Sequence, residues 1–208
     1  DLIIVATQNK DKVKEIKKIL HDLDVNVLTM GESGIDVDIE ENGTTFEENA
    51  RIKAEALTNY TDKLIIADDS GLEIDYLNKE PGIYSARYLG KDTSYIEKNQ
   101  IILDKLKDVP FEKRTARFVC AIAIAGKNIP TYTTTGTIEG YIGYEAKGEN
   151  GFGYDPIFYV EEYGATTAEI APEIKNQISH RAKALNLMKK QLIQILGQRM
   201  EDEREDVK

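Results

Sequence analysis

The sequence predicts an α/β protein in which a mixed β-sheet is flanked by helices. In the first half of the chain, short apolar runs at 2–6 and 64–67 alternate with helical patterns. Two long strand-like segments, 115–125 and 129–138, then follow one another around a glycine-containing turn, which indicates a hairpin. A hairpin-rich section after alternating strands and helices favours a mixed sheet over a doubly wound parallel one.

Each element of the first half has its own signal. The apolar run 2–6 is typical of a buried strand, and a helix follows it, with an apolar face made of Val13, Ile16, Ile19, Leu20 and Leu23. A second strand is expected over 25–30, and a Gly- and acid-rich loop over 31–43. Thr45 and Glu48 have capping-box spacing, which predicts a helix from there to about residue 60. The strand 64–67 is expected to stop at the polar residues 68–71.

The second half begins with an irregular stretch over 72–90 and a helix over 93–107. After the hairpin, the glycine-rich segment 148–156 excludes regular structure, and a short strand is expected over 156–160. A last helix should begin after Ser179 and run to about residue 196. The length of the chain predicts one large domain or two closely packed lobes over 1–198, followed by a charged and disordered tail over 199–208.

Composition limits the possible partners. The chain has 208 residues, with 27 basic and 37 acidic side chains, a net charge of −10 and a pI near 4.9. Nucleic acids and anionic membranes repel such a surface, so we expect neither as a partner. A single cysteine, Cys120, indicates a reducing, cytoplasmic compartment, and no apolar run reaches the 18 residues of a membrane span.

Asp68 and Asp69 directly follow an apolar strand, where a carboxylate can serve as metal ligand or general base. Glu40 or Glu41, in the acidic loop, could complete a Mg²⁺ site, since Mg²⁺ takes one or two carboxylates and otherwise water or phosphate oxygens. The alternative interpretation is an ordinary Asp-rich turn.

Cationic and donor groups form a second pattern. Thr7, Asn9 and Lys12 lie at a strand-to-helix turn, where free backbone N–H groups favour phosphate. Lys53 shares a helix face with apolar residues, so it either extends along that face towards solvent or reaches the cleft of Asp69. An ordinary Asn-capped helix with solvated lysines is the alternative for the first group.

The segment 148–156 could let backbone approach a flat ligand while Phe152 stacks on it, or it could be a mobile surface loop. Lys175 precedes Ser179, which is a good helix N-cap. His180 and Arg181 then fall in the first turn, where the helix dipole disfavours cations, so a ligand explains them better than helix stability does. The other histidine, His21, has no partner pattern and is interpreted as structural.

Six ordered stretches resemble the inosine triphosphate pyrophosphatase family, the non-canonical purine nucleoside triphosphate pyrophosphatases (XTP/dITP diphosphatases). They are TQNKDKVKEI, ENGTTFEENARIKAEAL, IADDSGLEIDYL, PGIYSARY, GENGFGYDPIF and ISHRAKAL. The resemblance runs from residue 3 to about 188. It implies an elongated two-lobed α/β fold with a central substrate cleft, a Mg²⁺ cofactor, a homodimer, and hydrolysis of ITP, dITP or XTP to the monophosphate and pyrophosphate.

The resemblance also assigns residues to roles. It implies that Asp69, Asp68 and Lys53 are catalytic, and that Glu40, in the E-x-x-G element, binds metal together with Asp69. The positions that it implies bind substrate are Thr7, Asn9, Lys12, Ser70, Phe152, Gly153, Tyr154, Asp155, Lys175, His180 and Arg181. In this interpretation Arg181 and the backbone N–H groups of 153–155 donate to the 6-oxo group of the purine.

Three other functions remain open at this point. A nucleotide-binding regulatory module would lack turnover, but the carboxylates and Lys53 argue against it. A metal-dependent nuclease is disfavoured by the low pI and the absence of a basic stripe. The related Maf-type nucleotide pyrophosphatases are closer, and the motifs ISHRA and GFGYDPIF favour the first family over them.

Overall fold

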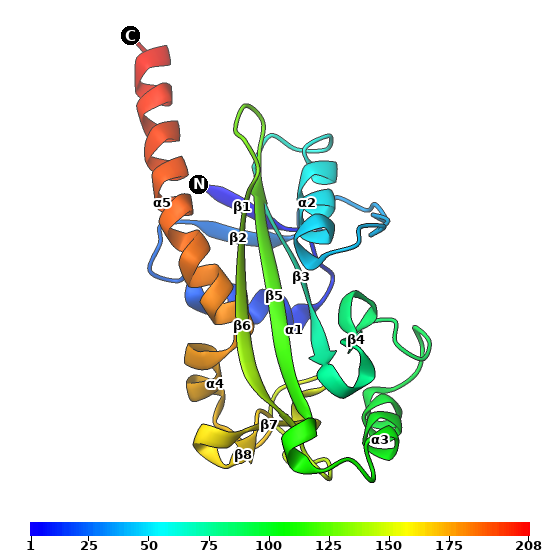
Figure 1. Cartoon of the computed structure of the whole chain (residues 1–208). Helices are drawn as coiled ribbons and strands as arrows, with labels where there is room; N and C mark the ends of the chain where they lie inside the picture. The colour runs from blue at the N-terminus through cyan, green and yellow to red at the C-terminus, as the bar shows by residue number, and fades with distance from the viewer. The chain divides into compact units, whose positions relative to one another are not determined.

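The computed structural model describes residues 1–208 and contains five α-helices and eight β-strands (Figure 1). The helices are α1 (Lys10–Ile19), α2 (Phe46–Leu57), α3 (Tyr95–Lys105), α4 (Pro172–Ile178) and α5 (His180–Asp206). The strands are β1 (Leu2–Val5), β2 (Asn26–Thr29), β3 (Leu64–Ile74), β4 (Glu80–Pro81), β5 (Thr115–Ala125), β6 (Tyr132–Ile142), β7 (Phe158–Val160) and β8 (Ala165–Thr166).

The strands form a mixed sheet in the order β2-β1-β3-β5-β6-β7-β8, with β4 paired to β3. β1 is parallel to both β2 and β3, with Ile3 opposite Val27 on one side and Leu64 on the other. The β3–β4, β6–β7 and β7–β8 pairs are antiparallel. The predicted class, a mixed sheet with flanking helices, is therefore confirmed.

The chain divides into two compact units. Unit 1 comprises Asp1–Asp69, Ala121–Gly136 and Arg181–Lys208, and unit 2 comprises Ser70–Cys120 and Thr137–His180. The strands β3, β5 and β6 each contribute residues to both units.

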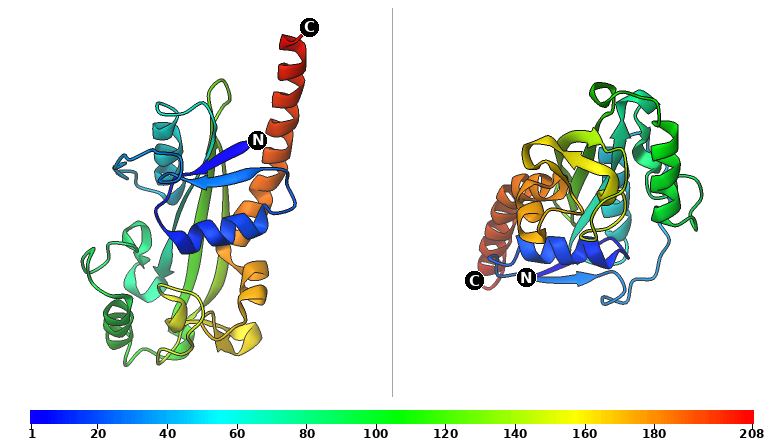
Figure 2. Two further views of the ribbon diagram at one scale, coloured as in Figure 1. Left: turned by 180° about the vertical axis from the view of Figure 1, so that it is seen from behind. Right: turned by 90° about the horizontal axis from the view of Figure 1, so that it is seen from below.

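In unit 1 the helices bury the faces that their sequence periodicity predicts. Val13 and Ile16 of α1 are buried, as are Ala50 and Ala54 of α2. The buried residues of α5 are Ala182, Ala184, Leu185, Met188, Leu192 and Ile195. Helix α1 lies beside the first turns of α5, as Figure 2 shows from behind, and Glu15 of α1 pairs with Arg181.

Unit 2 has its own hydrophobic core. It is built on β3, β5, β6 and β7, with α3 packed against it through Ile102, Leu103 and Leu106. Phe118 and Phe158 face each other in this core, with ring centroids 4.3 Å apart. This core supports the segment 148–157, which ends in a short 3₁₀ turn.

Strand β3 is longer than predicted, because Asp68-Asp69-Ser70-Gly71 lies inside it and does not end it. The Asp and Gly residues suggested a turn, but Asp68 is fully buried and its charge is compensated by cations from other elements. Strand β6 begins at Tyr132, after Pro130, which cannot donate to a strand ladder. The short elements β4, β8 and α4 had no predicted counterpart.

Helix α5 continues to Asp206, where the sequence indicated a disordered tail over 199–208 (Figure 1). This segment contains neither Gly nor Pro, and Gln198 donates to Asp202 one turn later, at 3.1 Å. None of the helices is long and apolar enough to cross a membrane.

Candidate active site

Asp68 and Asp69 are consecutive residues of β3, so their side chains leave opposite faces of the strand. The Asp68 carboxylate therefore meets partners from α1 and α5. The Asp69 carboxylate lies near charged side chains of α2 and of the loop before it. This alternation places two adjacent aspartates in different electrostatic environments.

Asp68 is surrounded by cations. Lys12 Nζ lies 3.2 Å from Asp68 Oδ2, and Arg181 Nε lies 3.6 Å from the same oxygen. Burial raises the pKa of Asp68, but the charges of Lys12 and Arg181 outweigh it and hold the pKa well below its ordinary value of 3.8. Asp68 is therefore ionised at any physiological pH and cannot act as a proton donor.

Asp69 has the opposite character. Burial, together with the charge of Glu41, raises the pKa of Asp69 to about 6, against the opposing charge of Lys53. Its Oδ2 atom is buried and has no hydrogen-bond partner. A buried, unpartnered carboxylate oxygen is costly to keep, so it marks a position where a ligand or metal would be bound.

Helix α2 directs Lys53 towards this carboxylate group. Lys53 Nζ donates to the backbone carbonyl oxygen of Asp68, and it lies 2.7 Å from Glu41 Oε1. Burial lowers the pKa of Lys53, but the charges of Asp68 and Glu41 outweigh it and raise the pKa. Of the two possibilities for Lys53, the structure shows the second, because the side chain reaches the carboxylates.

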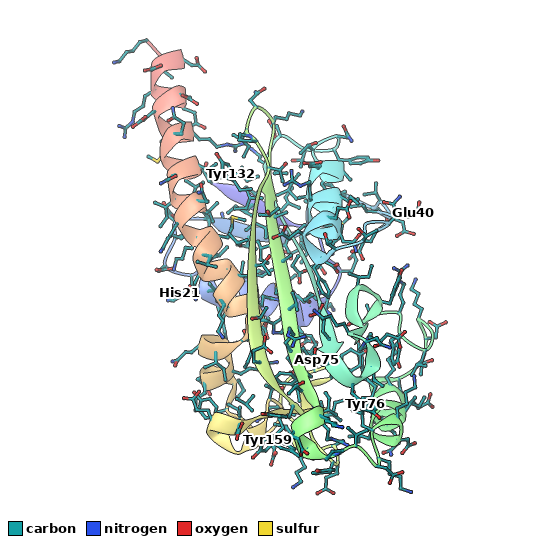
Figure 3. All side chains as sticks on the ribbon, viewed as in Figure 1. His21, Glu40, Asp75, Tyr76, Tyr132 and Tyr159 are labelled. Atoms are coloured by element: carbon teal, nitrogen blue, oxygen red, sulfur yellow. The ribbon has the colours of Figure 1, made fainter.

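The glutamate that reaches this group is Glu41, and Glu40 does not. Glu40 is exposed, and Figure 3 shows it at the outer edge of the loop that precedes α2. The turn that follows Glu41 is held from α2, where Asn49 Oδ1 accepts a hydrogen bond from Gly43 N at 2.8 Å. Glu41 is therefore the one of the two adjacent glutamates that faces Lys53.

The predicted phosphate-binding turn precedes α1. Asn9 is the N-cap, since its Oδ1 accepts from Asp11 N at 3.0 Å and Lys12 N at 3.2 Å, and Thr7 Oγ1 accepts from Asn9 N. The capping interpretation of Asn9 is thus confirmed. Thr7, Glu41 and Lys53 line one open hollow of about 190 Å³, whose apolar wall is made by Ala6, Met30, Val37 and Ile39.

In unit 2, the segment Phe152–Asp155 forms a tight turn. Asp155 N donates to Phe152 O at 3.2 Å, with a φ of +63° at Gly153 and φ, ψ of −86° and 1° at Tyr154. These are the values of a type II′ turn, which takes glycine at its first central position. The N–H groups of Gly153 and Tyr154 donate no hydrogen bond within the chain. Two adjacent backbone donors are thus available to a ligand.

The carboxylate of Asp155 holds this turn in place. Its Oδ2 accepts from Phe152 N at 2.9 Å and pairs with Lys175 Nζ at 2.5 Å, and its Oδ1 accepts from Thr167 Oγ1 at 2.7 Å. A Cβ atom on Gly151 would lie 2.2 Å from Asp155 Oδ2, so only glycine fits there. Asp155 and Lys175, predicted to bind substrate, have a clear anchoring role; their contact with substrate stays a prediction.

The remaining predicted residues of unit 2 differ in exposure. Phe152 is half-buried, and Lys175 Nζ lies 4.9 Å from its ring centroid. Tyr154 is buried and donates its hydroxyl to Ser85 O at 2.5 Å, so only its backbone can meet a ligand. His180 stacks on Phe118 at 4.9 Å between ring centroids, and Ser70 is half-buried on β3.

The predicted residues thus form two groups. Unit 1 holds Thr7, Asn9, Lys12, Lys53, Asp68, Asp69 and Arg181, and unit 2 holds Ser70, Phe152, Gly153, Tyr154, Asp155, Lys175 and His180. Two supporting residues had no sequence signal. Glu15 of α1 pairs with Arg181, and Thr167 binds Asp155. The i, i+3 spacing of Lys12 and Glu15 placed both on one helix face, but nothing in the sequence indicated what they would face.

We expect Lys175→Met to lower the free energy of unfolding by about 3–5 kcal/mol, because it leaves the buried Asp155 carboxylate without its cation. For a chain of this size that is a fall in Tm of roughly 6–20 °C. Thermal unfolding measures it, and Lys147→Met is the matched control. Lys147 forms an exposed pair with Glu145, worth less than about 1 kcal/mol. Equal effects of the two substitutions would contradict the anchoring role.

Two adjacent buried aspartates with opposite pKa shifts, one of them with an unpartnered carboxylate oxygen, mark a candidate enzyme active site in unit 1. Comparison with known proteins identifies the family to which the chain belongs. The model of the Ham1 family matches residues 3–191. The chain belongs to the Ham1 family.

Individual relatives agree with this. A dITP/XTP pyrophosphatase of Bacillus subtilis is 50% identical over 192 residues, which cover 91% of this chain and 96% of that protein. One of Listeria monocytogenes is 45% identical over 194 residues, covering 93% and 96%. The solved structure of the Staphylococcus aureus Ham1 protein has a TM-score of 0.83 at 45% identity, covering 92% of this chain and 98% of that one. The resemblance drawn from the six motifs is confirmed.

Proposed function

We propose that the chain is a Mg²⁺-dependent nucleoside triphosphate pyrophosphatase. It would hydrolyse dITP, ITP and XTP to the nucleoside monophosphate and pyrophosphate, and so remove non-canonical purines from the nucleotide pool. The activity rests on relatives named dITP/XTP pyrophosphatase, which cover nearly the whole chain. The single observation that carries the chemistry is Asp69, a buried carboxylate with a raised pKa and an unpartnered oxygen.

The residues around Asp69 fit a magnesium ion. Asp69 and Glu41 would hold it, since both present carboxylate oxygens to the region of Lys53. No group of three or more His, Cys, Asp or Glu side chains is arranged to hold a metal. Two protein carboxylates, completed by water and phosphate oxygens, are the usual set for Mg²⁺. When bound, the ion supplies charge neutralisation on the phosphate oxygens.

Proton transfer, charge stabilisation and positioning would be performed by different side chains. Asp69 would accept the proton of the attacking water. In the metal-free protein, burial and the charge of Glu41 raise the pKa of this carboxyl group to about 6, so it is mostly ionised at neutral pH. Lys53 and Lys12 would stabilise negative charge as the α–β phosphoanhydride bond breaks. Asp68, held ionised by Lys12 and Arg181, would keep these cations in position.

Recognition of the base would fall to the type II′ turn. The N–H groups of Gly153 and Tyr154 would donate to the 6-oxo group of the purine, with Phe152 stacked on the ring. Adenine carries an amino donor at that position. In a bound adenine this amino group would face the N–H donors of the turn. Such a polar mismatch can discriminate by about 10⁴–10⁵-fold. Arg181 pairs with Glu15 and Asp68, and its contact with the base stays a prediction.

A substrate panel tests the proposed function. We expect ITP, dITP and XTP, with Mg²⁺, to yield monophosphate and pyrophosphate, ATP to react far more slowly, and chelator to abolish turnover reversibly. Products separated by ion-exchange chromatography distinguish pyrophosphate from phosphate release. Release of single phosphates, or nucleotide binding without turnover, would contradict the proposal, and full activity after exhaustive metal removal would contradict the role of Mg²⁺.

The proposal includes a homodimer and a cytoplasmic location. The family resemblance supports the homodimer, and sedimentation equilibrium of the purified chain would test it. The single, buried Cys120 fits a reducing compartment.

A further inference from the structure

Asn99 of α3 touches the turn that carries the two available backbone donors. Its side chain is 4% exposed, and its Nδ2 donates to the carbonyl oxygen of Gly153 at 3.1 Å. Its Oδ1 is buried without a hydrogen-bond partner. A buried amide whose oxygen accepts no hydrogen bond destabilises the folded state. The only hydrogen bond of this side chain is the one to Gly153.

That hydrogen bond fixes the direction of one peptide group. The carbonyl of Gly153 and the N–H of Tyr154 belong to the same planar trans peptide, so they point in opposite directions. Because Asn99 binds the carbonyl, the N–H of Tyr154 is turned away from α3. This peptide is the central one of the type II′ turn, and no other hydrogen bond is made by its carbonyl oxygen.

The rest of the turn is held by different contacts. Asp155 fixes its two ends, and the Tyr154 ring is fixed by its hydroxyl bond to Ser85 O and its edge contact with Tyr95, at 5.1 Å between centroids. None of these contacts involves the carbonyl or the N–H of the central peptide. Rotation of that peptide by half a turn would convert type II′ to type I′ and require a positive φ at Tyr154, which a non-glycine residue resists but does not exclude.

We propose that Asn99 is a positioning residue for base selection, which orients the Tyr154 N–H towards the 6-oxo group of the purine through the Gly153 carbonyl. This inference rests on the proposed function, because it concerns recognition of the proposed substrate. Asn99 itself touches no reacting atom, so its effect lies in the choice of base and in substrate binding, not in bond cleavage.

Kinetics with two nucleotides test this role. Asn99→Ala should raise KM for ITP and lower the ratio of kcat/KM for ITP to that for ATP by about 3- to 10-fold, the effect of one neutral hydrogen bond. kcat for ITP should change less than about twofold. ATP has no acceptor at that position, so its kcat/KM should not fall. Gln100→Ala is the matched control, since Gln100 is exposed on the same helix and binds only Asp104.

Asn99→Asp keeps the shape of the side chain and replaces the donor by an acceptor that repels the Gly153 carbonyl. It should lower the ratio of kcat/KM for ITP to that for ATP further than Asn99→Ala does. If the alanine variant does not fold, the test uses Asn99→Asp alone. Equal losses for both nucleotides, or an unchanged ratio in folded variants, would overturn the inference while wild-type ITP hydrolysis leaves the proposed function standing. A wild-type chain that does not hydrolyse ITP would overturn both.

Discussion

Asp69→Asn is expected to lower kcat for ITP by about 10²–10⁴-fold, the usual contribution of a general base. The amide cannot accept the proton of water, and it is a poorer metal ligand than a carboxylate. Nucleotide binding should survive, because Lys12, Lys53 and the turn at Gly153 are unchanged. Steady-state kinetics and equilibrium binding of ITP separate the two effects. A variant that keeps more than about a tenth of wild-type kcat would refute the assigned role.

The same substitution should stabilise the metal-free protein at pH 7.5. The folded-state pKa of Asp69 is about 6, raised from 3.8. The contribution of this group to stability is therefore fully present below pH 3.8 and is lost as the pH rises through 6. Asn carries no charge, so the variant avoids this loss, which is roughly 3 kcal/mol at 1.36 kcal/mol per pKa unit.

Thermal unfolding in chelator over a pH series measures this difference. The gain in Tm should be present at pH 7.5 and shrink towards zero near pH 4. Asp36→Asn, at an exposed loop position, is the control and should change neither activity nor stability. An Asp69→Asn variant that is less stable than wild type at pH 7.5 would show that the buried carboxylate is compensated within the protein itself.

Glu41→Gln should raise the Mg²⁺ concentration needed for half-maximal activity by at least about 10–100-fold. Substituting a residue that only hydrogen-bonds to a metal ligand already lowers metal affinity by this factor. Glu40→Gln is the matched control, since it removes the same charge from the neighbouring position and should leave the Mg²⁺ requirement nearly unchanged. The Mg²⁺-dependent rise in Tm provides a readout independent of turnover. A larger effect at Glu40 would return the ligand assignment to the residue that the E-x-x-G spacing suggested.

The sequence located the candidate residues better than it located their surroundings. Periodicity and caps correctly predicted α1, α2 and the strand β5, because local pattern determines them. The polar run at Asp68 was predicted to end β3, because its burial depends on Lys12 and Arg181, which lie far away in sequence. The choice between Glu40 and Glu41 also depends on a distant contact, with Lys53. Local pattern therefore identifies residue types, whereas pairing across elements decides which of them face the same point.

The placement of Asp68 and Asp69 on a strand makes this part of the sequence intolerant of insertions and deletions. A strand reverses the direction of its side chains at every residue, so a shift of one position moves each of them to the opposite face. One residue inserted into β3 before Asp68 would move the Asp68 carboxylate to the α2 side and leave Lys12 and Arg181 without the carboxylate that they face at this point of the strand. Both aspartates would still be present, but the two cations would have lost this partner. Variation in the length of this enzyme should therefore be confined to loops that lie outside the strands and carry no site residue, such as 126–131.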